Sequence, residues 1–138
     1  DINLEGGLGL WDDLVIRKAE GELDYAMCAN STNSLGCLAA SESAGRTDYK
    51  VFGIDDEADQ LAALTKENSI YYATVAQNPF EIGVQVMEAA VHAVEGQDDG
   101  IVKVDGILVT RDTVQEYMAN REKSLEELKD YLAIITAS

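Results

Sequence analysis

The sequence has few basic residues, two cysteines and one histidine, and each shortage excludes a class of function. Ten Lys and Arg residues stand against 26 Asp and Glu residues, which gives the 138-residue chain a formal net charge of −16 at pH 7. This charge repels a phosphate backbone, so we expect no nucleic-acid partner. Cys28 and Cys37 lack a zinc-binding spacing, and His92 lies in an amphipathic stretch with no nucleophile signature nearby. We therefore expect no metal site, no cofactor and no histidine-dependent catalysis.

Long hydrophobic runs are also missing. No apolar run approaches the ~20 residues that a membrane span needs, and no charged segment followed by an apolar stretch opens the chain. We expect neither a membrane span nor a signal peptide in these residues, and the Asp at position 1 predicts that the chain begins after a cut. Apolar residues make up 46% of the chain and charged residues 26%, which is ordinary for one globular domain.

Short apolar runs alternate with stretches of helical periodicity. Buried strands are predicted over residues 23–29, 49–55, 70–77 and 106–110. Helices are predicted over residues 11–20, 31–45, 56–68, 79–95 and 111–136. The glycine-rich residues 1–10 are expected to hold a flexible loop, with a short strand at the start. The alternation predicts an α/β fold whose parallel sheet is flanked by helices on both faces.

Three polar residues stand where the first three predicted strands end. Asn30, Asp55 and Gln77 would lie along one edge of a parallel sheet, which is where α/β proteins bind ligands. Two amides and a carboxylate suit a polyhydroxylated ligand. The same residues are also ordinary helix caps and turn formers, so spacing leaves both interpretations open. Asp56 beside Asp55 lacks a third acidic group for a metal, and no acid–base pair for an enzyme is visible.

The segments that contain these residues resemble a known family. AMCAN, SLGCLAA, VFGID, ATVAQNPFEIG and GILVT resemble the C-terminal half of type I periplasmic sugar-binding proteins, the ribose- and galactose-type solute-binding components of ABC importers. The resemblance runs from about residue 20 to residue 118. It places Asn30, Asp55 and Gln77 at ligand-contacting positions. Ser31 departs from the family pattern, which usually has Asp there, but Ser can cap a helix equally well.

The resemblance implies a non-enzymatic protein that binds a monosaccharide or related small polar ligand and delivers it to the membrane permease of an ABC transporter. It implies an extracytoplasmic location, either in the periplasm or lipid-anchored at the cell surface. Residues 1–77 and 106–138 would form a partial C-terminal lobe. Residues 78–105 would supply a helix and a strand that cross a hinge and pack in an N-terminal lobe missing from this chain.

The missing lobe leaves two explanations, a proteolytic or engineered fragment and a natural half-protein. In either case the predicted helix over 79–95 would expose an apolar stripe unless the missing lobe or self-association covers it. The stripe consists of Ile82, Val86, Met87, Ala90 and Val94. A ligand-sensing domain of a LacI-type regulator, or of a chemotaxis or sensor-kinase system, is the alternative function, since such proteins share this lobe.

Overall fold

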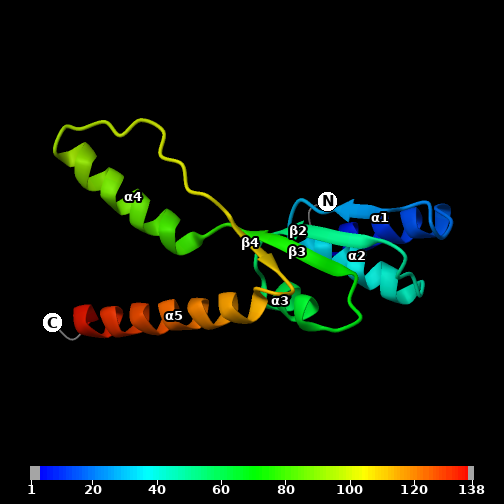
Figure 1. Cartoon of the computed structure of the whole chain (residues 1–138). Helices are drawn as coiled ribbons and strands as arrows, with labels where there is room; N and C mark the ends of the chain where they lie inside the picture. The colour runs from blue at the N-terminus through cyan, green and yellow to red at the C-terminus, as the bar shows by residue number, and fades with distance from the viewer. Residues whose placement is uncertain (1–3, 137–138) are drawn as a thin grey trace.

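The structure of the protein is a computed structural model, which describes the backbone of residues 4–136 and the side chains of residues 6–129 (Figure 1). The strand predicted at the very start of the chain falls largely outside these residues. The elements in chain order are α1 (Leu4–Arg17), β1 (Tyr25–Met27), α2 (Ser31–Ser43), β2 (Lys50–Ile54), α3 (Ala58–Thr65), β3 (Tyr71–Ala76), α4 (Pro79–Val94), β4 (Ile107–Thr110) and α5 (Val114–Thr136).

The four strands form one sheet in the order β1-β2-β3-β4. Strands β1, β2 and β3 are parallel, whereas β4 is antiparallel to β3, with Ala76 opposite Ile107. The predicted α/β lobe is confirmed, but the last strand corrects the expectation of a wholly parallel sheet. The chain leaves the carboxyl end of β3 and returns at that same end, so β4 must run in the opposite direction.

The helices cover one face of the sheet. Val51, Tyr71 and Val109 point into a core that is completed by side chains from α1, α2, α3 and α5. The opposite face carries large side chains that remain exposed; Met27, for example, is 70% exposed. Among the described residues no helix packs on that face, so the expectation of helices on both faces is wrong. We call it the open sheet face. Its residues are Tyr25, Met27, Lys50, Phe52, Ile54, Tyr72, Val75 and Leu108.

Helix α1 runs through the glycines that the sequence predicted to be a loop. These glycines are tolerated because they let α1 lie directly against α2. A Cβ atom at Gly36 would lie 2.8 Å from the backbone nitrogen of Leu8 and 2.9 Å from the carbonyl carbon of Gly7. The close approach buries Val15 of α1 in the core. Tertiary packing therefore outweighs the roughly 1 kcal/mol that a helical glycine costs relative to alanine.

Arg46 fastens the end of α1 to the loop before β2. Its Nη1 donates to the carbonyl oxygens of Val15 at 3.1 Å and Lys18 at 2.7 Å, groups that a helix end leaves without partners. Its Nε and Nη2 donate to the two carboxylate oxygens of Asp48 at 2.6 and 2.9 Å. Arg46, helped by the backbone N–H of Gly21, holds the pKa of the Asp48 carboxyl well below its usual range.

This lowered pKa predicts a pH-dependent contribution to stability. A carboxyl whose pKa is lower in the folded than in the unfolded state stabilises the fold above its unfolded pKa of about 3.9, and the contribution is lost as the pH falls below that value. We expect Asp48→Asn to be less stable than the parent near pH 7. We expect the two proteins to converge as the pH falls below about 4. Thermal unfolding followed by circular dichroism at several pH values measures this, and a constant difference in Tm would contradict it.

Helix α4 and the segment that follows it extend away from the sheet (Figure 1). None of the side chains of α4 is buried, so the apolar stripe expected on this helix is exposed. The strand expected within residues 78–105 is not formed, because the extended segment after α4 has no strand beside it with which to pair. His92 is 2.8 Å from an Asp99 carboxylate oxygen and so ties that segment to the helix. We call residues 78–105 the α4 arm.

Candidate functional site

Asn30 lies at the carboxyl end of β1 and caps α2. Its Oδ1 accepts hydrogen bonds from the backbone N–H of Asn33 at 2.9 Å and from the Thr32 hydroxyl at 2.9 Å. Accepting such bonds is typical of an N-cap residue, because the first backbone N–H groups of a helix have no partner within the helix. The Nδ2 group of Asn30 has no partner among the described residues and stays available as a donor.

Asp55 follows β2 and lies at the centre of the site. One carboxylate oxygen accepts a hydrogen bond from the backbone N–H of Ser31 at 3.0 Å, and the other accepts from the side-chain amide of Gln77. Its backbone has φ +80°, in the left-handed region that Asp tolerates better than most residues. The Asp55 N–H donates to the carbonyl of Val75 at 3.0 Å, and the Thr74 hydroxyl donates to the Asp55 carbonyl at 2.6 Å. These bonds fix the direction of the carboxylate.

The structure therefore brings Asn30, Asp55 and Gln77 together at one edge of the sheet, as the strand-end argument predicts. Asp55 touches Gln77 directly and reaches the Asn30 cap through Ser31. The backbone N–H of Ser31 was not anticipated, because a main-chain donor leaves no signal in residue identity. The ligand-binding role of the three side chains stays a prediction.

Gln60 supports this edge from beneath and was also not anticipated. It is completely buried, and its Nε2 donates to the Ile54 carbonyl at 2.9 Å and to the Tyr71 hydroxyl at 2.8 Å. Its Oε1 accepts from the backbone N–H of Glu57 at 3.1 Å. Ile54 and Glu57 flank the turn that carries Asp55, so one amide holds both ends of that turn. A buried Gln that makes three hydrogen bonds is satisfied and rigid.

Asp56 serves the attachment of α5. The Tyr117 hydroxyl donates to its carboxylate at 2.7 Å, and Arg121 donates to its carbonyl at 2.8 Å. Burial, together with this contact to a negative charge, raises the pKa of Tyr117. Among the described residues no three His, Cys, Asp or Glu side chains are grouped as metal ligands would be.

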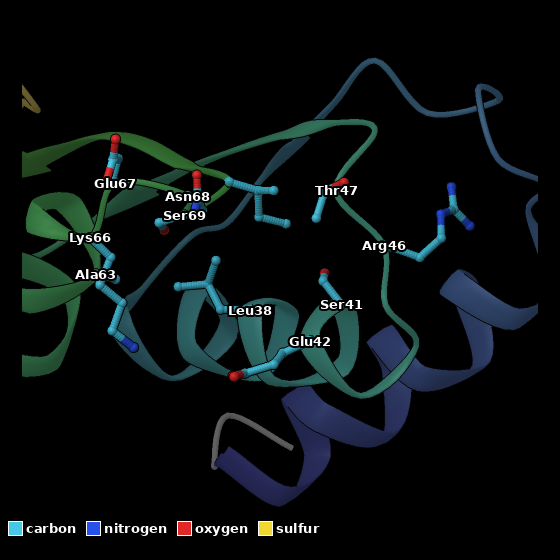
Figure 2. A pocket seen from close by; sticks show the side chains of 11 residues that line it. Leu38, Ser41, Glu42, Arg46, Thr47, Ala63, Lys66, Glu67, Asn68 and Ser69 are labelled. Carbon is cyan, nitrogen blue, oxygen red and sulfur yellow. The ribbon is translucent and has the colours of Figure 1, made fainter.

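A hollow of about 480 Å³ lies at the opposite end of the sheet (Figure 2). Leu38 and Ser41 of α2 line it on one side, and residues 66–70, which lead into β3, line it on another. It is thus at the amino ends of the strands, whereas Asn30, Asp55 and Gln77 are at the carboxyl ends. The hollow is not part of the site that the sequence predicted.

The fold agrees with the family comparison. The family model described as a periplasmic binding protein domain matches residues 12–98, which is more than half of the chain. The chain belongs to this family, whose members bind solutes and are not enzymes. No curated protein matches the sequence. Within the part of the chain that the structure describes, no helix is both long and apolar enough to cross a bilayer.

Several solved structures with the same fold are solute-binding proteins of ABC transporters. The chain superposes on such a protein from Agrobacterium vitis with bound allitol, with a TM-score of 0.78, 24% identity and coverage of 85% of this chain and 41% of that one. It also superposes on one from Bacillus halodurans with bound myo-inositol, with a TM-score of 0.71, 28% identity and coverage of 85% and 40%. It superposes on an arabinose-binding protein from Shewanella with a TM-score of 0.73 and 19% identity. That match covers 92% of this chain and 43% of the Shewanella chain. The chain thus spans about 40% of the length of these structures.

Proposed function

We propose that this lobe forms one wall of a binding site for a small polyhydroxylated solute, such as a monosaccharide or a cyclic polyol. Asp55 would hold the ligand, with Asn30 and Gln77 on either side. The observation that carries the proposal is the convergence of these three side chains around one fixed carboxylate at the carboxyl edge of the sheet. The myo-inositol in the Bacillus halodurans protein, which is 28% identical, supports a ligand of this class.

The hydrogen-bonding capacity of the site suits hydroxyl groups, which both donate and accept. An ionised carboxylate has room for about four hydrogen bonds, and two of those of Asp55 are used by Ser31 and Gln77. The remaining lone pairs can accept ligand hydroxyls in charge-assisted bonds, the strong kind. Gln77 donates through its nitrogen and keeps its oxygen as an acceptor, while Asn30 keeps a donor.

The site is open on one side, since Gln77 is exposed and Asp55 is half-buried. A second lobe that closes over the ligand would supply the remaining contacts, and the α4 arm would pass into it. The wider proposal is an extracytoplasmic solute-binding component that presents its ligand to an ABC permease. What supports it is membership of the periplasmic binding protein domain family, together with the shared fold.

Because this chain supplies one wall only, we expect weak binding. Calorimetry with myo-inositol, D-allose or L-arabinose at about 1 mM should resolve no heat of binding. We expect a Kd above 1 mM, which corresponds to a binding free energy weaker than about 4 kcal/mol. Titration of the ¹⁵N-labelled chain to about 100 mM ligand should shift the amide signals of Ser31, Asp55 and Gln77. Asp55→Asn should abolish these shifts, because Asn tolerates the same backbone conformation but lacks the charge.

The matched control is Asp59→Asn, which removes an exposed carboxylate from α3 and should leave the shifts unchanged. Tight binding by calorimetry would overturn the idea that the chain holds half of a site. Shifts that gather around the hollow of Figure 2, or that survive Asp55→Asn, would overturn the assignment of the site.

A further inference from the structure

We propose that Cys28 and Cys37 form a redox pair, which closes to a disulfide within the core when the chain meets a disulfide oxidant. The proposal rests on the proposed function only for the extracytoplasmic location, where such oxidants act. It is independent of the ligand site. The contacts that carry it are made inside the lobe, between the end of β1, the inner face of α2 and the start of β2.

Cys28 directly follows β1 and points into the core. Its backbone N–H donates to the Phe52 carbonyl at 2.9 Å, so the residue continues the alternation of the strand. Ala26 and Cys28 are buried, whereas Met27 between them is 70% exposed. Since successive side chains of a strand point to opposite faces, the Cys28 thiol lies on the face of the sheet that the helices cover.

Cys37 lies on the side of α2 that packs on the sheet. The buried residues Ser34, Cys37 and Ser41 are separated by three and four positions, which places them on one side of the helix. Cys37 is completely buried, and its sulfur lies 3.9 Å from the Tyr49 hydroxyl. The Cys28 thiol is in hydrogen-bonding contact with Ser34 and with the Cys37 thiol. The two thiols therefore already meet in the folded chain, as a disulfide requires.

The groups around the two thiols leave the sulfurs available to each other. Within the described residues no third His, Cys, Asp or Glu joins the pair to make a metal site. The neighbouring hydroxyls have other partners. The Ser34 hydroxyl donates to the Asn30 carbonyl at 2.9 Å, the Ser41 hydroxyl donates to the Cys37 carbonyl at 2.6 Å, and the Tyr49 hydroxyl is hydrogen-bonded to Ser41. Closing a disulfide removes weak S–H contacts and leaves these hydroxyls satisfied.

The two thiols differ in acidity, which sets the order of the exchange. The hydrogen bond from Cys37, with a smaller contribution from Ser34, lowers the pKa of Cys28, although burial opposes this effect. The contact with Cys28, together with burial, raises the pKa of Cys37. Because the thiolate is the nucleophile in thiol–disulfide exchange, Cys28 makes the first attack.

The exchange has two steps and needs a disulfide, R–S–S–R, as the oxidant. The Cys28 sulfur attacks one sulfur of the oxidant and forms a mixed disulfide, and the released RS⁻ takes up the proton that Cys28 lost. The Cys37 sulfur then attacks the Cys28 sulfur, and the second RS⁻ leaves and takes up the proton of Cys37. Two protein thiols are oxidised to one disulfide, and the oxidant is reduced to two thiols.

The disulfide would stabilise the corner of the lobe that carries Asn30. The loop that it closes has about ten residues, and for this size the chain-entropy model gives a folding equilibrium about 100-fold more favourable. By a thermodynamic cycle, folding must strengthen the disulfide by the same factor. Both factors can be measured.

The test uses the full 138-residue chain, with oxidised and reduced glutathione as the probe at about pH 8. Oxidised glutathione is added to the folded chain and also during refolding from urea, so that burial of the thiols cannot prevent the exchange. We expect a monomer without free thiols, lighter by two hydrogen atoms and without attached glutathione. The urea midpoint should rise by about 1–2 M. In glutathione buffers the disulfide should be about 100-fold more favoured in water than in concentrated urea.

Cys28→Ala and Cys37→Ala are the matched controls, since each leaves one thiol and cannot form the internal bond. Treatment with oxidised glutathione should not raise the urea midpoint of either variant. The thiol count and the ligand titration are separate measurements, so a failure of the redox pair is distinct from a failure of the ligand site.

Three results would overturn the proposal. The first is a chain that keeps both thiols after refolding with oxidised glutathione. The second is attached glutathione, or a bond between two chains, in place of the internal disulfide. The third is an oxidised chain no more stable in urea than the reduced chain, which would show that the two thiols serve only as small core side chains.

Discussion

Replacing Gly36 by alanine is expected to lower the free energy of unfolding by about 3 kcal/mol, the upper part of the range for overpacking a close contact. The added methyl group would lie 2.8 Å from the Leu8 nitrogen and 2.9 Å from the Gly7 carbonyl carbon. Both are main-chain atoms, which cannot rotate away as the end of a side chain can. Relief therefore requires α1 to move off α2, and that movement withdraws Val15 from the core.

Urea unfolding followed by the fluorescence of Trp11, the lone tryptophan, measures this effect, since Trp11 packs partly against the core from α1. Gly9→Ala is the matched control, because nothing lies within 4 Å of a Cβ atom there. That change should stabilise the chain by up to about 1 kcal/mol through helix propensity. Equal effects of the two substitutions would show that α1 and α2 do not touch as described. Faster proteolysis within α1 should accompany the loss of stability in Gly36→Ala.

Replacing Gln60 by leucine is expected to cost about 3 kcal/mol or more and to disturb the candidate site as well. The amide makes hydrogen bonds to the Ile54 carbonyl, the Tyr71 hydroxyl and the Glu57 N–H, and each of these bonds is buried or partly buried. Leucine fills a similar volume but removes the amide that these three groups bind, and a buried group left unsatisfied costs about 1–3 kcal/mol. Since two of them flank Asp55, the turn loses two of the bonds that hold it in place.

The same urea experiment measures the stability of Gln60→Leu, and amide chemical shifts report on the site. The signals of Ser31 and Gln77 should move in Gln60→Leu because both bind the Asp55 carboxylate, whereas the hydrogen bonds of Gln60 go to Glu57, Ile54 and Tyr71. Gly36→Ala should leave the Gln77 signal in place. Gln115→Leu makes the same chemical change at an exposed glutamine of α5, so it controls for the change from a polar to an apolar side chain. A site unchanged by Gln60→Leu would show that Asp55 is positioned by other contacts.

The edge of the sheet where Asn30, Asp55 and Gln77 meet could be predicted because parallel strands end on the same side. The residues that directly follow each strand in the sequence therefore become neighbours at that edge.

The groups that hold Asp55 in place at this edge could not be predicted. The Ser31 N–H is main chain, and Gln60 sits in a helix whose pattern places polar residues near solvent. Only the packed fold shows that it faces the interior.

The other differences have physical reasons of the same kind. Glycines at the start of the chain indicated a loop, but Gly36 on α2 makes a helix there favourable, and the two positions are far apart in sequence. An apolar strand gives no information on its direction, so the antiparallel β4 could not be distinguished from a parallel strand. Tyr72 and Val75 suggested a strand buried on both faces, yet they lie on the open sheet face.

The α4 arm joins the sheet through two chain segments that pass side by side. Ala76 at the exit is opposite Ile107 at the return, and a Cβ atom on Gly106 would lie 2.6 Å from a Val75 methyl group. Two adjacent connections swing easily about the axis that runs through both and resist twisting, so the arm has one soft rotational degree of freedom. Helix α4 has 16 residues and a length of about 24 Å. A swing of about 10° therefore carries its far end through about 4 Å, while the backbone angles of only a few residues need to change.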